Sequence, residues 1–237
     1  MVGSGNVSFI FKKEFKVYFL SPIAYIVISI FLILAGWFFF STFFLYNQAE
    51  LRSFFSMLPV IFSFIVPAVT MRLFSEEFNV GSFETLATLP VSLSEIIIGK
   101  LLASVAFISI MLIPTLSYAV SVAFLGDLDW GPVLGGYIGS VLLGAAFSAI
   151  GLFASSLTRS QIIAFIIGMI ICFALTVVET LLFFLPESMV GFFQYIAADH
   201  HFQNIARGII DSRDIIYFLS LIFVASYATH VTMQEKR

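Results

Sequence analysis

The side chains most suggestive of chemistry are three consecutive residues in the C-terminal part of the chain, Asp199, His200 and His201. Histidine beside a carboxylate is a donor set found in many zinc sites. Neighbouring side chains diverge, however, and no further ligand follows at a suitable spacing. A capping or interhelical role is therefore favoured over metal binding. The third histidine of the chain, His230, does not supply the spacing of a catalytic or metal-binding cluster.

A second candidate is Glu179, which lies within a long apolar run. A charge at the middle of a membrane costs roughly 2.5–3.5 kcal/mol and so suggests a function. Because Glu179 stands seven residues before Pro186, we expect it near the outer interface. A hydrated or paired structural role is favoured there over a substrate contact. Together with His201 and Arg207, Glu179 defines a candidate polar site within the membrane or on its outer side.

The sequence predicts no catalytic, cofactor-binding or metal-binding residue in this chain. Cys172 stands alone in an apolar run, which excludes disulfides and thiolate clusters and predicts a buried apolar side chain. There is no Gly-rich loop followed by Lys and Ser or Thr, the motif that cradles ATP phosphates. Any ATP chemistry must therefore come from a partner.

The chain carries most of its internal charge in one polar stretch, residues 72–95. Glu76 and Glu77 precede Gly81, a predicted break, and the one or two short helical turns that follow end at Pro90. A short helix across the cytoplasmic face, tied to two spans, could receive force from a partner. An ordinary amphipathic connector with solvated charges is the alternative.

The elements that position these residues are predicted to be membrane helices. Of the 237 residues, 60% are hydrophobic and 11% charged, with a mean hydropathy of +1.08, whereas soluble domains carry about 25% charged residues. The first apolar run has 24 residues without a charge, enough at about 1.5 Å per residue to cross a hydrocarbon core of roughly 30 Å. The predicted fold is a single all-α membrane domain over residues 1–237, with transmembrane helices at about 22–45, 53–71, 96–125, 132–157, 161–185 and 215–231.

An amphipathic helix is predicted before the first span, over residues 7–20. Its side chains separate onto two faces of a 3.6-residue wheel. The apolar face holds Val7, Ile10, Phe11, Phe15, Tyr18 and Phe19, and the basic face holds Lys12, Lys13 and Lys16. Three basic charges beside anionic lipid favour the cytoplasmic surface. Glu14 falls within the apolar arc, so we expect it to need a protein partner.

Two spans carry signs of close helix packing. Pro59 and Pro67 free backbone carbonyls that neighbouring helices must satisfy, so the second span is expected to be kinked and to contact protein. Small residues in the fourth span would let other helices approach closely. Its glycines are Gly135, Gly136, Gly139, Gly144 and Gly151.

The sequence also predicts two helix caps and one short helix. Ser94 is placed to cap the third span, and Asp214 to cap the last one. Phe202, Ile205 and Ile209 share a helical face, which predicts a short helix resting on or dipping into the outer membrane surface.

The distribution of basic residues orients the chain. With the N-terminus inside, eight basic residues are cytoplasmic and three lie outside, as the positive-inside rule requires. The eight are Lys12, Lys13, Lys16, Arg72, Lys100, Arg159, Lys236 and Arg237, and the three are Arg52, Arg207 and Arg213. Both termini are therefore predicted to be cytoplasmic.

The order of motifs along the chain resembles the ABC-2 type permease family. Lys-Glu-Phe and Ser-Pro stand at residues 13–15 and 21–22, and the polar stretch supplies Arg-Leu-Phe-x-Glu-Glu, Glu-Thr-Leu, Leu-Pro-Val and Gly-Lys. Residues 201–218, HFQNIARGIIDSRDIIYF, resemble the segment that enters the family's last span. The resemblance covers nearly the whole chain and is strongest to gliding-motility permeases of the GldF type.

This resemblance implies roles for two cytoplasmic segments. The first becomes the family's elbow helix, with polar positions Lys12, Lys13, Glu14 and Lys16. The second is a coupling helix, in a loop that docks into a groove on an ATPase. Its implied contact residues are Glu76, Glu77, Gly81, Phe83, Glu84, Thr85, Leu86, Leu89 and Pro90. The carboxylates could meet basic groups on the ATPase or the elbow lysines, while Phe83 and Leu86 would supply an apolar anchor. Arg159, in the loop 158–160, is a second and smaller contact.

The resemblance also implies the partners. The chain would be a non-catalytic permease subunit in a bacterial cytoplasmic (inner) membrane, coupling ATP hydrolysis to export or to force transmission. Two ABC ATPase subunits would hold ATP and Mg, and this chain would bind no cofactor. A second permease-type subunit would be another copy of this chain or a related protein with a large extracytoplasmic domain. Membrane lipid is a partner and nucleic acid is not.

Other classes fit the residues less well. A secondary transporter would need charges at the midplane and repeated halves, and neither is evident in the sequence. An intramembrane enzyme would need clustered His, Asp or Ser inside the spans. A channel-like protein without an ATPase is a further alternative, although the predicted tight packing argues against a wide aqueous pore. The substrate, whether lipid-like or polymeric, is left open.

Overall fold

The computed structural model describes residues 4–46, 50–83, 91–181, 187–209 and 211–236, in which all regular structure is helical. Six helices in these ranges are long and apolar enough to cross a membrane, which confirms the predicted all-α, six-span fold. The helices are α1 (Ser4–Leu20), α2 (Pro22–Tyr46), α3 (Arg52–Thr70), α4 (Arg72–Val80), α6 (Leu93–Leu112), α7 (Leu116–Leu125), α8 (Trp130–Leu157), α9 (Gln161–Leu181), α10 (Glu187–Ile196), α11 (Ala198–Ala206) and α12 (Ser212–Glu235).

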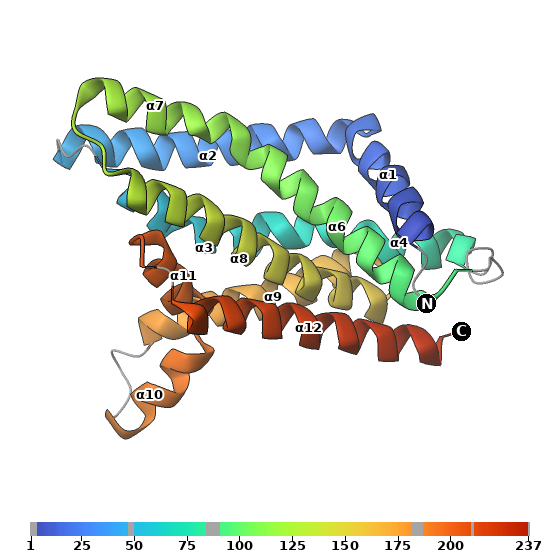
Figure 1. The fold of residues 1–237 in the computed structure, drawn as a ribbon. Coiled ribbons are helices and arrows are strands. Elements are labelled where there is room, and N and C mark those ends of the chain that lie inside the picture. Colours follow the sequence, from blue (N-terminus) through green and yellow to red (C-terminus); the bar gives the residue numbers. More distant parts are fainter. Residues whose placement is uncertain (1–3, 47–49, 84–90, 182–186, 210, 237) are drawn as a thin grey trace.

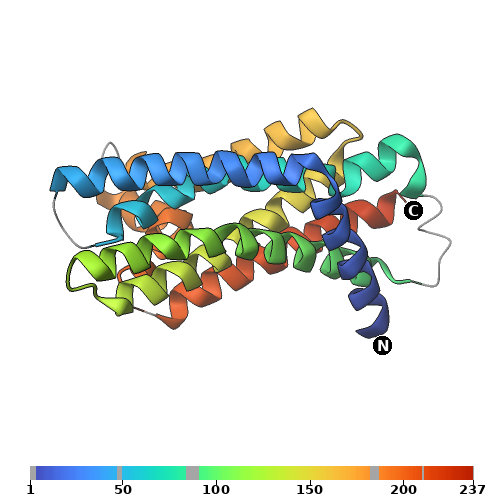
Figure 2. The same ribbon diagram turned by 90° about the horizontal axis from the view of Figure 1, so that it is seen from above.

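The spans run back and forth along one axis, so both termini lie at the same end of the bundle (Figure 1). We call this the terminal end, and it also carries α1, α4 and the start of α6. The opposite end, which we call the far end, carries α10 and α11. Figures 1 and 2 both show α1 set at a steep angle to α2.

The centre of the bundle is α8, which packs against α3, α6, α9, α11 and α12. Its glycines lie where other elements come closest. A methyl group on Gly136 would overlap the ring of Phe55, and one on Gly151 would overlap Thr70. The prediction that small residues allow close approach in the fourth span is therefore confirmed.

The third span is divided by Pro114, which lacks a backbone N–H and cannot continue the α-helical ladder. A 3₁₀ turn, Ile113–Thr115, separates α6 from α7 at this point. The second span likewise continues past Met71 into α4. The last predicted residues of the fifth span, 182–185, lie outside the described ranges.

Both predicted helix caps are wrong. Ser92, not Ser94, caps α6, because its side chain accepts a hydrogen bond from the Glu95 N–H, and the Glu95 carboxylate accepts one from the Ser92 N–H. Asp211, not Asp214, caps α12 by accepting a hydrogen bond from the Arg213 N–H. In both cases the helix begins three residues before the predicted span, since the first turn contains polar side chains that an apolar pattern leaves out.

The helix predicted on the outer membrane surface is present as α11, but its surroundings differ from the prediction. Phe202 and Ile205 are fully buried, and α11 packs against α8. Ile209 lies beyond the end of α11 and is exposed. The apolar face of α11 is therefore part of the protein core.

Candidate functional site

At the terminal end, α1 packs along α6. The approach is close at Gly99, where a methyl group would run into the side chain of Ile10. Further along α1, the ring of Tyr18 stacks on that of Phe107 with centroids 5.0 Å apart. The basic side chains of α1 are exposed on its other face: Lys12, Lys13 and Lys16.

One buried lysine joins three helices at this end. The Lys100 Nζ on α6 donates hydrogen bonds to Glu14 Oε1 on α1 at 3.0 Å and to Glu77 Oε1 on α4 at 2.7 Å. It also donates to the Leu73 carbonyl at 2.8 Å. We call Lys100, Glu14 and Glu77 the Lys100 cluster. Glu14, which the sequence predicts to need a protein partner, finds it here.

Burial makes the Lys100 cluster a strong connection. The Lys100 side chain is only 1% exposed, and those of Glu14 and Glu77 are 11% and 15% exposed. Charges held away from water attract each other more strongly than the same charges at the surface. Separating them without new partners is costly, because each would remain buried and unpaired. The cluster therefore links α1, α4 and α6 through buried ion pairs.

Tyr18 adds a second link between α1 and the end of α3. Its hydroxyl donates to the Val69 carbonyl at 3.3 Å, and the Arg72 guanidinium lies 4.8 Å from its ring centroid. Burial raises the pKa of Tyr18, opposed by the charge of Arg72 and aided by that of Glu14. The phenol therefore remains a neutral donor.

The junction between α3 and α4 is held by a single serine of α8. The Ser155 hydroxyl donates to the Met71 carbonyl at 2.7 Å and accepts from the backbone N–H groups of Phe74 and Ser75 at 2.9 and 3.0 Å. These are backbone groups that a helix terminus leaves without partners. Ser155 therefore sets the direction in which α4 leaves the membrane span.

The predicted ATPase-contact residues divide into described and undescribed ones. Glu76 is exposed, Glu77 belongs to the Lys100 cluster, and Gly81 ends α4 with a φ of 76°, in the left-handed region that favours glycine. Phe83 is buried, with its ring 5.1 Å from that of Phe78. The remaining residues lie outside the described ranges: Glu84, Thr85, Leu86, Leu89 and Pro90. Contact with an ATPase stays a prediction for all of them.

The C-terminal end of α12 closes the same region. Lys236 Nζ donates to the Ser156 carbonyl at 2.6 Å and lies 4.7 Å from the ring centroid of Phe78 on α4. Burial, followed by the nearby charge of Arg159, lowers the pKa of Lys236. Arg159 itself is exposed between α8 and α9. The terminal end thus brings the predicted second contact close to α4.

At the far end, His201 joins α11 to α12. Its Nδ1 lies 2.6 Å from Asp214 Oδ1, and its Nε2 lies 3.2 Å from the Tyr195 carbonyl oxygen. Its ring stacks on Tyr217, with centroids 4.1 Å apart. Both ring nitrogens thus face oxygen atoms of neighbouring helices, Asp214 on α12 and Tyr195 on α10. This is an interhelical role, the one favoured by the sequence.

Glu179 lies close to the neighbouring histidine. Its Oε1 is 3.7 Å from His200 Nδ1, and its side chain is 33% exposed. Burial, followed by the proximity of His201, lowers the pKa of His200. The neutral imidazole is thus favoured, which makes the contact a weak one. Glu179 contacts His200 in this structure, and a contact with substrate stays a hypothesis.

Asp199 gives this region a dependence on pH. Burial, opposed by a hydrogen bond from Gln203 and reinforced by Glu179, raises the pKa of Asp199 from 3.8 to about 6. The folded chain therefore holds this proton more tightly than the unfolded chain does. The resulting stabilisation is fully present below about pH 4 and is lost as the pH rises through about 6.

Replacing Asp199 by asparagine is expected to mimic the protonated form. Asp199→Asn should raise the melting temperature in detergent by about 2–4 °C near neutral pH, equivalent to about 1 kcal/mol for a chain of this size. The gain should vanish at about pH 4, where wild-type Asp199 is itself protonated. Asp127→Asn, in an exposed loop, is the control. A gain that is equal at both pH values would contradict the assignment.

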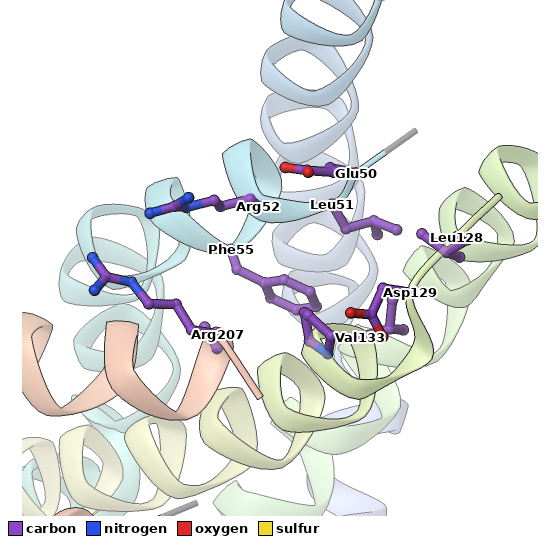
Figure 3. Close-up of a pocket in the computed structure, with 10 residues that line it drawn as sticks. Glu50, Leu51, Arg52, Phe55, Leu128, Asp129, Val133 and Arg207 are labelled. Carbon is purple, nitrogen blue, oxygen red and sulfur yellow. The ribbon is translucent and has the colours of Figure 1, made fainter. Parts of the chain in front are cut away.

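Arg207, the third member of the predicted polar site, lies in a different pocket from His201. This pocket is lined by Arg52, Arg207, Phe55 and Asp129 among others (Figure 3). The polar pocket that contains His200 and His201 has Gln194, Asn204 and Asp214 in its wall instead. The structure therefore brings Glu179 near His201 through His200, while Arg207 lines the other pocket.

Sequence reasoning missed three residues with structural roles at these sites. The sequence places Lys100 in the cytoplasmic charge count and in the Gly-Lys motif, gives Ser155 no role, and predicts a helix cap at Asp214. Lys100 gave a usable signal, since it is a lone charge that follows three apolar residues and a glycine. Ser155 gave none, because serines also fill helix surfaces without a partner.

Comparison with known proteins identifies a family for this chain. Residues 8–224 match a family model described as ABC-2 family transporter protein. The matched range contains the whole Lys100 cluster as well as His201 and Asp214. A search of the curated proteins found no match.

Proposed function

The chain belongs to the ABC-2 family of transporter proteins, and on this basis we propose that it is the permease subunit of an ATP-driven ABC transporter. It couples ATP hydrolysis by partner ATPases to export or to force transmission across the membrane. The ATPases hold ATP and Mg, and this chain has no catalytic role.

The observation that carries the proposal is the Lys100 cluster. Residues 84–90, the predicted docking loop, follow directly after Phe83 and precede α6 in the sequence. Glu77 on one side of the loop and Lys100 on the other are bound to each other at 2.7 Å. A force applied to the loop therefore reaches α4 and α6 together, and Glu14 passes it to the elbow helix α1.

The orientation follows from the two ends of the bundle. The terminal end carries α1 with its exposed lysines, as well as Arg72, Arg159 and Lys236. The far end carries the three basic residues that were predicted outside: Arg52, Arg207 and Arg213. We infer that the terminal end faces the cytoplasm, where two ATPase subunits dock.

A second membrane subunit completes the complex in this proposal. Much of α2, α9 and α12 presents apolar side chains that are exposed in the single chain, including Trp37, Ile170 and Phe223. Lipid or a second permease-type subunit covers these faces in the membrane. That subunit is another copy of this chain or, as in a gliding-motility transporter, a related protein with an extracytoplasmic domain.

Purification of the tagged chain from its native membrane in mild detergent is expected to yield a bound ATPase and ATP hydrolysis. Glu84→Lys and Leu86→Asp should each release most of the ATPase, because one reverses a charge and the other places a carboxylate in the apolar anchor of a small interface. The measurement is the ATPase band and the ATP hydrolysis rate per mole of permease.

Asp127→Lys makes a comparable charge reversal at an exposed position of the far end and should leave the ATPase bound. Retention of the ATPase by both loop variants would refute the docking loop. Absence of any ATPase from the wild-type preparation would instead favour a secondary transporter or a channel-like protein.

A further inference from the structure

A pocket of about 240 Å³ opens at the far end, between the start of α3, the start of α8 and the end of α11 (Figure 3). Its volume is below the roughly 300–1,000 Å³ typical of sites for drug-sized ligands. A group the size of a lipid headgroup suits it better than a whole substrate molecule.

The two arginines of the pocket lie on the opposite side from Asp129. Figure 3 shows the guanidinium groups of Arg52 and Arg207 on one side of the Phe55 ring and the Asp129 carboxylate on the other. Glu50 also lines the pocket. Neither arginine forms an ion pair with any residue in the described ranges, and both are exposed. Two cations that converge without an anion between them are suited to bind one.

The floor of the pocket is apolar and tightly packed. Phe55 is 1% exposed, and Leu51 and Val133 are 3% exposed. The Phe55 ring packs directly against the backbone of α8 at Gly136, which has no side chain. Its centroid lies 5.3 Å from that of the Tyr137 ring. The charged side chains thus surround a buried apolar surface, with Arg52 in the first turn of α3 and the other three at helix ends or in adjoining loops.

The pocket lies at the level of a membrane surface. Arg52 is the first residue of α3 and Asp129 is the N-cap of α8, and each of these helices crosses the membrane. Trp130, the first residue of α8, is 53% exposed. Tryptophan at such a position is typical of the boundary between hydrocarbon and water, where lipid headgroups lie.

We propose that this pocket binds the headgroup of a zwitterionic phospholipid with a primary amine, of the phosphatidylethanolamine class. The phosphate lies between Arg52 and Arg207, and the ammonium group faces Glu50 and Asp129. The apolar floor contacts the glycerol end of the lipid. A purely anionic lipid would satisfy the arginines but leave the carboxylates facing its negative charge.

The test is native mass spectrometry of the purified, delipidated full chain, titrated with one probe at a time. Phosphatidylethanolamine is expected to bind at least about tenfold more tightly than phosphatidylglycerol or inorganic phosphate. Arg52→Gln and Arg207→Gln should each weaken its binding about tenfold, the loss expected for a charge-assisted hydrogen bond. Arg52→Lys keeps the charge and should retain part of the affinity.

Two further variants separate the headgroup charges. Asp129→Asn keeps an N-cap residue for α8 but removes the negative charge. It should weaken phosphatidylethanolamine binding and leave phosphatidylglycerol binding equal or stronger. Arg213→Gln makes the same charge change at the far end outside this pocket, and should bind like the wild type.

Three results would overturn the proposal. Equal affinity of inorganic phosphate would mean that the arginines hold a free anion rather than a lipid. Equal affinity of phosphatidylglycerol, unchanged in Asp129→Asn, would remove the zwitterionic preference. Full retention of phosphatidylethanolamine by both arginine-to-glutamine variants would place lipid binding elsewhere. None of these outcomes depends on whether an ATPase binds the terminal end.

Discussion

Replacement of Lys100 by methionine is expected to destabilise the chain by about 3–5 kcal/mol, the usual cost of removing one partner from a buried ion pair. Methionine fills a similar volume, so a cavity contributes little to the effect. The loss arises because the carboxylates of Glu14 and Glu77 remain largely buried and lose the cation between them. Within the described residues, Glu14 keeps only Lys13, whose half-exposed ammonium lies 3.7 Å away. Thermal unfolding in detergent should show a fall in melting temperature of about 10 °C or more.

Neutralising the two carboxylates should restore much of this stability. In the triple variant Lys100→Met, Glu14→Gln, Glu77→Gln no charge is left without a partner, and replacement of a complete buried ion cluster by neutral groups is often close to neutral. Lys16→Met, an exposed lysine of the same elbow helix, is the matched control and should change the melting temperature very little. If Lys100→Met and Lys16→Met have the same melting temperature, the cluster does not hold the three helices together.

The triple variant also separates stability from coupling. Under the proposed function it should fold and bind the ATPase, since the predicted docking loop is unchanged, but α4 and α6 are no longer joined by a charge pair. We expect its ATP hydrolysis to persist while transport or force output falls. Normal output in a folded triple variant would show that force reaches the spans by another route.

Replacement of Gly135 by alanine is expected to cost about 2 kcal/mol, although alanine is the better helix former. Alanine gains about 1 kcal/mol in a helix interior, whereas overpacking typically costs about 1–3 kcal/mol, and more where nothing can yield. At Gly135 the new methyl would overlap the Ile205 carbonyl oxygen and lie 3.2 Å from the Gly208 Cα. These are backbone atoms, so no change of rotamer relieves the overlap and α11 must move away from α8.

The measurement is again the melting temperature, with a fall of about 4–8 °C expected for Gly135→Ala. Gly191→Ala is the matched control, because Gly191 also lies in a helix but has nothing within 4 Å of an added methyl. It should be neutral or slightly stabilising. Equal melting temperatures of the two variants would show that α11 can shift away from α8 at little energetic cost.

The two ends of the molecule carry different polar groups. This difference is expected for a membrane protein whose two ends face different sides of the bilayer. The terminal end holds the buried Lys100 cluster and the exposed lysines of α1. The far end holds the His201–Asp214 pair and the pocket between Arg52 and Arg207. The central helix α8 reaches both, through Ser155 at one end and Gly135 at the other.

The amino-acid sequence determined the features that depend on local pattern. Apolar length predicted the six spans, because the hydrocarbon thickness sets a minimum helix length. The wheel of α1 predicted its exposed lysines and the need of Glu14 for a partner. Gly81 predicted the end of α4, because its left-handed backbone conformation strongly favours glycine.

The tertiary structure alone decided which distant residues meet. Lys100 is 86 residues from Glu14 and 23 from Glu77, and no periodicity relates such positions. The same holds for Ser155, 84 residues from the carbonyl that it binds. Hydrophobic patterning predicts which face of a helix is buried, but not which neighbouring helix covers that face. The pairing of buried polar groups is set by how the helices pack, and here it decides which segments are joined by buried ion pairs and hydrogen bonds.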